Sequence, residues 1–239
     1  MRQFLYLSIV VFCLNTIHAV SQTDKERAVT LFQLKEFDAA KTFFESHLNS
    51  FPQDWEAIEY MGDIAAHQHN WEDAVAIYEE LTVRFPQNAN YHYKLGGSMA
   101  MKATQNRWYA LTHYKSIETQ FKTALSLDNS HIDVHWALIE YYLQLPVILG
   151  GTQEKAEFYA NRLHQISPVD GYLAQGRIAD YYKDVKAGET AYKKAVEVGG
   201  SEHSYQKLLA FYRKTNKHAK ADKVLQQALK KHPDFEEKN

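Results

Sequence analysis

A repeat of 34 residues constrains this chain more than any other feature of its sequence. Shifting the stretch 71–86 by one period superposes aromatic, small, aromatic and Pro residues: Trp71 on Phe37, Ala74 on Ala40, Tyr78 on Phe44 and Pro86 on Pro52. Within one period the apolar residues recur at helical spacing on both sides of a polar break at 68–70, which predicts a helical hairpin. One hairpin cannot bury its own apolar face, so the pattern requires a stack of hairpins.

The same pattern continues to the C-terminal end of the chain. The matching positions are Leu95, Gly96, Met99, Phe121, Ala124, Trp136, Ile139, Leu143, Ala156, Leu163, Tyr172, Gly176, Ala179, Tyr192, Ala195, Tyr205, Leu208, Tyr212, Ala221, Leu225 and Ala228. This pattern resembles the tetratricopeptide repeat, which has the same period. The resemblance implies an all-α solenoid of about six helical hairpins that spans residues 22–239.

The first 21 residues have a different character from the rest. Arg2 precedes an apolar run from Phe4 to Leu14, and Ala19 offers a small residue for cleavage, which predicts a secretory signal peptide over residues 1–21. The run is shorter than the roughly 20 residues of a permanent span. An uncleaved anchor and acylation at Cys13 are the alternatives that we consider weaker. We therefore expect an exported protein, periplasmic or extracellular, without stable membrane insertion after cleavage.

The third and fourth hairpins are longer than the period, by nine and five residues. In the third hairpin the surplus around Lys102–Tyr109 predicts a second helix that is lengthened at its start. In the fourth hairpin Pro146 should end the preceding helix. The glycines at 150 and 151 then allow a turn with positive φ, and Thr152 can cap the next helix.

Each insertion carries apolar residues that have no place in the repeat: Trp108 and Tyr109 in one, and Val147, Ile148 and Leu149 in the other. Because exposed apolar patches are rare on monomers, we predict that the two groups cover one another; the alternative is a binding site for a partner. The Pro…Gly-Gly…Lys-Ala arrangement, which ends at Lys155 and Ala156, resembles a subset of bacterial envelope tetratricopeptide proteins. That resemblance implies an exported protein without an assigned activity.

No sequence pattern points to catalysis, a metal or a cofactor. His131 and His135 lie four residues apart, but no third ligand accompanies them, and the only cysteine belongs to the predicted signal peptide. Gly96-Gly97 lies inside a helical pattern and is expected to serve packing rather than phosphate binding. Acidic pairs such as Glu56 and Glu59 lie on an open helix face, without the enclosed pocket of acid–base catalysis. We expect a protein that is not an enzyme.

Charge is distributed unevenly along the chain. Residues 20–87 include 5 basic and 13 acidic residues, whereas residues 201–239 include 9 basic and 5 acidic ones. The lysines of the last predicted helix form a solvated face that is too modest for nucleic-acid binding. The expected partner is therefore a protein and not a nucleic acid.

In the repeats that this chain resembles, first helices line a concave groove, and positions i, i+3, i+7, i+10 and i+11 point into it. Here that spacing predicts a groove with an acidic beginning, a tyrosine-lined middle and a basic end. The candidate groove residues are Glu56, Glu59, Asp63, Tyr93, Met101, Tyr141, Leu173, Arg177, Tyr181, Arg213 and Lys214. Tyr suits such a surface because it offers contact area together with a hydroxyl. The alternative is that these residues form ordinary solvated helix faces.

Two functions follow as hypotheses. The leading one is a non-enzymatic scaffold of the bacterial cell envelope that binds an extended partner segment in this groove. The alternative is a glycan-binding or glycan-processing envelope protein, which the groove tyrosines would suit. One relative can be set aside: chaperone-tail-binding tetratricopeptide domains hold a carboxylate with Lys and Asn, but here Lys25 is followed one turn later by Val29.

Overall fold

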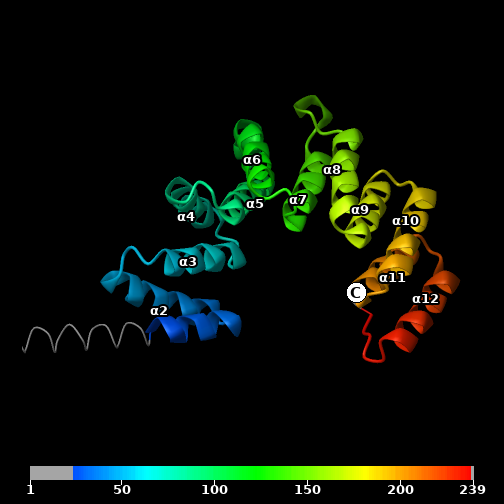
Figure 1. Ribbon diagram of the computed structural model, residues 1–239, viewed down its shortest axis with the longest axis horizontal. Coiled ribbons are helices and arrows are strands. Elements are labelled where there is room, and N and C mark those ends of the chain that lie inside the picture. Colours follow the sequence, from blue (N-terminus) through cyan, green and yellow to red (C-terminus); the bar gives the residue numbers. More distant parts are fainter. Residues whose placement is uncertain (1–23, 238–239) are drawn as a thin grey trace, which may run out of the picture. The chain divides into compact units, whose positions relative to one another are not determined.

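The computed structural model describes residues 24–237, and these residues contain helices but no strand (Figure 1). They belong to two compact units that divide between Gln120 and Phe121. Below we call residues 24–120 the N-terminal unit and residues 121–237 the C-terminal unit. The all-α class predicted from the sequence is confirmed.

The helices alternate as first and second helices of hairpins, beginning with the helical residues 24–33. They are α2 (Phe37–Ser50), α3 (Trp55–His67), α4 (Trp71–Arg84), α5 (Ala89–Gln105), α6 (Arg107–Leu127), α7 (Ile132–Gln144), α8 (Gln153–Ile166), α9 (Pro168–Tyr181), α10 (Val185–Val198), α11 (Glu202–Lys214) and α12 (His218–Lys231), with a short 3₁₀ helix η1 (Val147–Leu149) between α7 and α8. The described residues therefore contain the helices of the six expected hairpins.

Short polar turns join the two helices of a hairpin. In four hairpins the turn contains one residue with positive φ: Lys35 at 63°, His69 at 59°, Lys183 at 60° and Asn216 at 57°. A polar side chain then caps the next helix at two of them, since Asn70 accepts from the Asp73 N–H and Asp184 from the Ala187 N–H. These repeated turns explain why the hairpins recur at nearly constant spacing.

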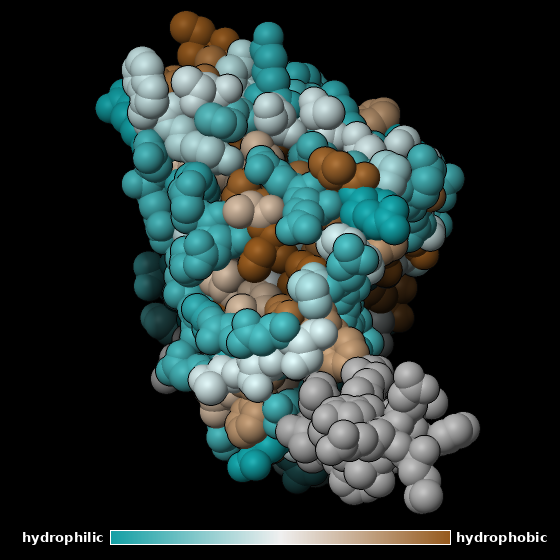
Figure 2. Space-filling model, turned by 90° about the vertical axis from the view of Figure 1, so that its left-hand side faces the viewer, coloured by the Kyte–Doolittle hydropathy of each residue, from teal (hydrophilic) through white to brown (hydrophobic). Residues whose placement is uncertain are grey.

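Small and aromatic residues pack against each other inside each hairpin, as predicted. Ala40 and Ala74 are fully buried, and Phe44 and Tyr78 are almost fully buried. A Cβ added to Gly62 would lie 3.0 Å from the ring of Tyr78, so the absence of a side chain brings α3 close to α4. On the face that Figure 2 shows, hydrophilic residues surround smaller groups of hydrophobic ones.

The additional residues by which the third hairpin exceeds the period are divided between its two helices. α6 has 21 residues where α4 has 14, and α5 has 17 where α3 has 13, whereas the connection shortens to Asn106 alone. The predicted lengthening of the second helix is confirmed. The first helix is extended as well, which the sequence pattern did not indicate.

The insertion of the fourth hairpin forms the predicted turn. α7 ends at Gln144, Gly150 has a φ of 98°, and the Thr152 hydroxyl accepts from the Lys155 N–H. The loop is closed by its own hydrogen bonds, because the Lys155 ammonium also donates to the Gly150 carbonyl at 2.9 Å.

The prediction that the two insertions cover one another concerns side chains of both units, and it stays a prediction. Each insertion makes contacts within its own unit: Tyr109 stacks on His113 at a ring distance of 3.8 Å, and the Lys155 ammonium closes the η1 loop. Within their own units these contacts leave Trp108 75% exposed, and Val147 and Ile148 80% and 93% exposed.

The predicted signal peptide lies outside the described residues. No helix between residues 24 and 237 combines the length and the hydropathy of a membrane span.

Candidate functional site

The first helices of the N-terminal unit present carboxylates that are bridged by lysines. Glu59 and Asp63 on α3 both lie against the ammonium of Lys94 on α5, at 2.7 and 2.8 Å. Lys25 lies 2.9 Å from Asp54 and 2.8 Å from Glu56. The acidic residues lie on the predicted face, but their charge is matched by the neighbouring first helices.

Tyrosine hydroxyls complete this network. Tyr91 donates to Glu59 at 2.9 Å, and Tyr78 donates to Asp63 at 2.5 Å. Burial, together with these carboxylates, raises the pKa of Tyr91 to about 12 and raises the pKa of Tyr78 further. Both hydroxyls therefore stay protonated and act as donors, which ties the second helix α4 to the charged face of α3.

The first helices of the C-terminal unit are joined in the same manner. The Arg177 guanidinium on α9 binds Glu140 on α7 through two contacts of 2.7 and 2.8 Å. Lys214 on α11 lies 2.7 Å from Asp180 on α9. Successive hairpins are thus connected by ion pairs along what we call the first-helix face of each unit.

Helix α11, the first helix of the sixth hairpin, also holds the C-terminal segment of the chain. Phe235 is buried in the core of the C-terminal unit, and the Gln206 amide on α11 donates to the Glu236 carbonyl. Arg213 pairs with Glu237 at 3.2 Å and with Asp222 at 3.0 Å. Residues 235–237, which follow a turn at 233–234 and carry two carboxylates, therefore lie against this part of the first-helix face.

The candidate groove residues fall into three groups. Glu56, Met101, Tyr181 and Lys214 are exposed, and Glu59, Asp63, Tyr93, Tyr141, Arg177 and Arg213 are half-buried. Leu173 is wrong as a groove residue, because it is only 3% exposed and packs in a cluster with Tyr205 and Trp136. Helical spacing placed Leu173 on α9 correctly but did not show that α7 and α11 cover it.

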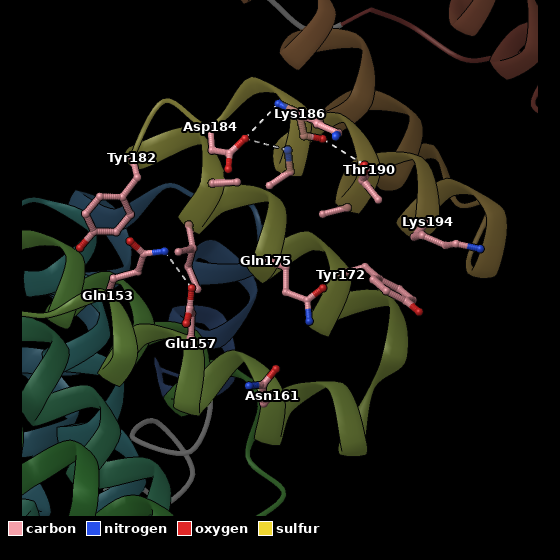
Figure 3. Close-up of a pocket in the computed structure, with 14 residues that line it drawn as sticks. Gln153, Glu157, Asn161, Tyr172, Gln175, Tyr182, Asp184, Lys186, Thr190 and Lys194 are labelled. Atoms are coloured by element: carbon pink, nitrogen blue, oxygen red, sulfur yellow. Dashed lines mark hydrogen bonds between the residues drawn. The ribbon is translucent and has the colours of Figure 1, made fainter.

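A second site, which the sequence analysis did not predict, lies on the side of α9 that faces away from Arg177 and Tyr181. Its floor is formed by α9 and α10, and its two edges come from the second helices α8 and α10 (Figure 3). The groove has a volume of about 650 Å³. We call it the α8–α10 groove. The sequence contains two indications of this groove. Polar residues recur every four positions on both α8 and α10, and alanines occupy the neighbouring positions on α9 and α10.

The two edges of the α8–α10 groove differ in charge. The α8 edge consists of Gln153, Glu157 and Asn161, and the Gln153 amide donates to the Glu157 carboxylate at 2.8 Å. The α10 edge consists of Lys186, Thr190 and Lys194. The floor is formed by small and apolar side chains and one amide: Gln175, Ile178, Ala179, Ala187 and Ala191. Tyr172 and Tyr182 also line the groove.

The equivalent position in the N-terminal unit is much narrower. A cavity of about 150 Å³ lies between α2, α3 and α4, lined by Lys41, Met61, Ile64, Ala65, Gln68, Asn70, Asp73, Ala76 and Ile77. We call it the α2–α4 groove. A wide groove is therefore not a general result of stacking these hairpins.

The histidine pair on α7 does not form a site. His135 is fully buried, its Nδ1 lies 3.0 Å from the His131 carbonyl oxygen, and burial lowers its pKa. Within residues 24–237 no three His, Cys, Asp or Glu side chains gather in a way that could hold a metal ion.

Comparison with known proteins agrees with this architecture. The model of the tetratricopeptide repeat family matches residues 205–234. A search of curated proteins finds no match. A thermophilic tetratricopeptide repeat protein of Thermus thermophilus superposes with a TM-score of 0.60 at 20% identity, covering 76% of this chain and 92% of that one.

Two further structures show the same fold. PilW, described as a widely conserved type IV pilus biogenesis factor, gives a TM-score of 0.62 at 14% identity and covers 91% of this chain and 96% of its own. YrrB, described as a tetratricopeptide repeat protein with an unusual peptide-binding site, gives 0.50 at 15% identity, with coverages of 76% and 87%. The described residues therefore have the fold of tetratricopeptide repeat proteins, and residues 205–234 match the model of that family. Tetratricopeptide repeat proteins generally serve as scaffolds for protein–protein interaction.

Proposed function

We propose that the protein is an exported, non-enzymatic scaffold of the bacterial cell envelope that binds an extended partner segment on its first-helix face. The observation that carries this proposal is the C-terminal segment on α11. There the chain's own residues 235–237 bind outside any helix, through a buried aromatic side chain, a main-chain carbonyl and a carboxylate. These are the contacts that the same face would offer to a partner.

The charges of the first-helix face define the kind of segment it suits. Lys214 is largely exposed while it pairs with Asp180, and exposed pairs stabilise a structure only weakly. A partner carboxylate can therefore replace Asp180 at little cost. Tyr181 lies beside Arg177, whose guanidinium is 5.7 Å from its ring centroid, and provides an exposed aromatic surface next to that charge. The face thus suits an extended segment with acidic and apolar side chains.

Export is supported by the N-terminal sequence, whose short apolar run and small residue at Ala19 are typical of a secretory signal. Cell fractionation tests this part of the proposal directly. The mature protein should lack about 20 residues and appear with the periplasmic or extracellular fraction. A full-length protein that remains in the cytoplasm would contradict export.

Site-specific photo-crosslinking in native envelopes tests the binding face. A photoreactive phenylalanine at Tyr181 or Met101 should give a crosslinked protein, and one at the exposed Val83 on the second helix α4 should not. Crosslinking at Val83 alone would place the partner elsewhere. The alternative, glycan binding, would show as retention of the purified mature chain on peptidoglycan or exported polysaccharide without any protein adduct.

A further inference from the structure

We infer that the α8–α10 groove is a second docking site, for an extended peptide segment with two acidic side chains four residues apart. It lies on the side of α9 opposite to Arg177 and Tyr181, because the groove residues of α9 follow the other stripe of the helix. A partner there would leave the first-helix face free. The protein would then hold two segments at once.

The length of the groove sets the spacing of the acidic side chains. Lys186 and Lys194 are eight residues apart on α10, which corresponds to about 12 Å along a helix. In an extended segment four residues span about 13 Å, and alternate side chains point to the same side. Acidic residues at i and i+4 therefore match the two lysines, while the residue at i+2 faces Thr190.

The floor suits a peptide backbone more than bulky side chains. Ala179, Ala187 and Ala191 are short, so a main chain can lie close to α9 and α10. Side-chain amides stand at both ends and in the middle of the groove, at Gln153, Asn161 and Gln175. Each amide both donates and accepts hydrogen bonds, which is what a peptide N–H and C=O require.

The charges of the two edges select the orientation of the segment. Lys186 forms no ion pair with any residue from 24 to 237, and Lys194 pairs only with Glu197 on its own helix, where both side chains are exposed. Acidic side chains can therefore bind both lysines. On the opposite edge Glu157 repels acidic side chains and favours basic or neutral ones. An extended segment with acidic residues on one side only satisfies both edges.

The probe is a fluorescein-labelled peptide with the core Glu-Lys-Ser-Lys-Glu between Gly-Ser flanks, titrated with the mature chain by fluorescence anisotropy. Saturable binding should appear at low salt and weaken as salt is added. A peptide with both Glu changed to Gln, and one with the two Glu only two residues apart, should each bind about tenfold more weakly.

Two variants of the protein locate the binding. Lys186→Glu with Lys194→Glu should weaken binding at least tenfold, and so should Ala191→Ile, which fills the floor without changing charge. The matched control is Glu72→Lys with Glu80→Lys, which changes the corresponding positions of α4 and should leave the affinity for the peptide unchanged. Thermal unfolding of each variant confirms that it is folded.

No saturable binding of the probe, or binding that ignores both the lysine reversal and Ala191→Ile, would overturn the inference. Equal binding of the three peptides would also overturn it, because the groove would then not recognise the spacing of the acidic residues.

Discussion

The α2–α4 groove and the α8–α10 groove occupy the same position in two units, yet only the second is wide. The hairpin cores correspond: Gly62 is equivalent to Gly176 and Tyr78 to Tyr192, and each glycine lies against its tyrosine ring. The volumes of the two grooves nevertheless differ, at about 150 and about 650 Å³. Side chains that the repeat pattern does not specify contribute to this difference, together with the shorter connection between α8 and α9.

Two replacements contribute to the smaller volume of the groove in the N-terminal unit. Ile77 stands where the C-terminal unit has Ala191, and its methyl group lies 3.0 Å from the position of a Cβ on Gly62. Gln68, at the position of Tyr182, donates to Asp38 on α2 at 2.6 Å and joins the two sides of the groove. In the C-terminal unit Tyr182 is exposed instead.

The charges of the two grooves are reversed as well. On the second edge, Glu72 and Glu80 of α4 correspond to Lys186 and Lys194 of α10. On the first edge, Lys41 of α2 corresponds to Glu157 of α8. Positions outside the hairpin core, which the fold leaves free, therefore determine the charge of each groove and contribute to its width.

The largest effect is expected where the two units are alike. Tyr78→Ala and Tyr192→Ala should each destabilise the protein by about 3–5 kcal/mol, because a buried ring leaves a cavity between the helices of its hairpin. Denaturant unfolding measures both. A loss well below that range in either variant would contradict the shared role of the tyrosine.

The two glycines should differ in their tolerance of a methyl group. A Cβ on Gly176 would lie 2.6 Å from the Tyr192 ring, and one on Gly62 would lie 3.0 Å from the Tyr78 ring. Gly176→Ala should therefore destabilise by about 1–2 kcal/mol, even after the gain in helix propensity of about 1 kcal/mol. Gly62→Ala should stay within about 0.5 kcal/mol of the parent. If denaturant unfolding showed the same loss of unfolding free energy in both variants, the two hairpins would not differ in their tolerance of a methyl group.

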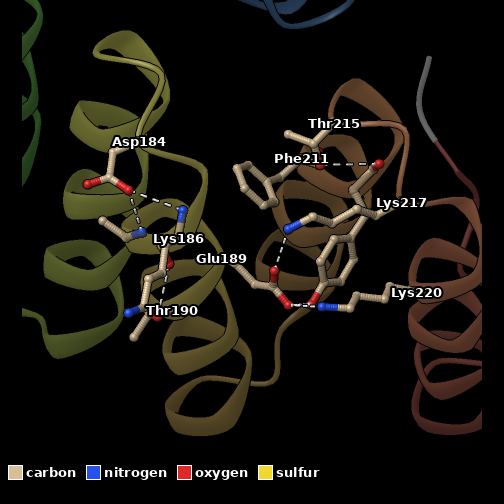
Figure 4. Close-up of polar contacts among 10 residues, drawn as sticks. Asp184, Lys186, Glu189, Thr190, Phe211, Thr215, Lys217 and Lys220 are labelled. Carbon is tan, nitrogen blue, oxygen red and sulfur yellow. Dashed lines mark hydrogen bonds and ion pairs between the residues drawn. The ribbon is translucent and has the colours of Figure 1, made fainter.

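Glu189 on α10 makes the C-terminal unit dependent on pH at a position where the N-terminal unit has the buried Val75. It contacts Lys217 at 2.6 Å and also contacts Lys220 and Tyr212 (Figure 4). Hydrogen bonds from the lysines lower the pKa of Glu189 to about 2. Its stabilising effect is therefore complete above about pH 4.5, the ordinary pKa of Glu, and is lost as the pH falls towards 2.

Glu189→Gln tests this dependence. The variant should melt at a lower temperature than the parent at pH 7, and the difference should shrink between about pH 4.5 and pH 2 because the parent loses its carboxylate there. A difference that stays constant over this range would mean that the ion pairs with the lysines do not contribute. Glu197→Gln, at an exposed pair on the same helix, is the matched control and should change little.

A modest effect is expected from exchanging the residues that contribute to the groove width. Ala191→Ile enlarges a side chain that is only 7% exposed at the floor of the groove, and it should destabilise the protein by about 1 kcal/mol. Ile77→Ala removes a half-buried side chain and should destabilise by about 1 kcal/mol. Differential scanning calorimetry resolves both. A large loss from Ala191→Ile would mean that the groove is less open than the structure shows.

The hairpins and the packing inside them could be predicted from the amino-acid sequence alone. Ala74 and Tyr78 repeat Ala40 and Phe44 one period earlier, and a small residue beside a large one at helical spacing has a single simple arrangement in a hairpin. Pro146, Gly150 and Thr152 likewise defined the turn before α8, because each restricts the backbone or caps a helix locally. These features can be predicted because they depend on residues close together in the sequence and not on a neighbouring helix.

The charge pairing, the burial and the groove width at the surface could be seen only in the tertiary structure. Glu59 and Asp63 are matched by Lys94 from the next hairpin, and Leu173 is covered by neighbours on both sides. The α8–α10 groove depends on three helices at once, so no single periodicity contains it. The physical reason is that a helix pattern indicates which side of a helix is apolar, whereas charge pairing, coverage and width depend on side chains that the fold brings into contact from the neighbouring hairpins.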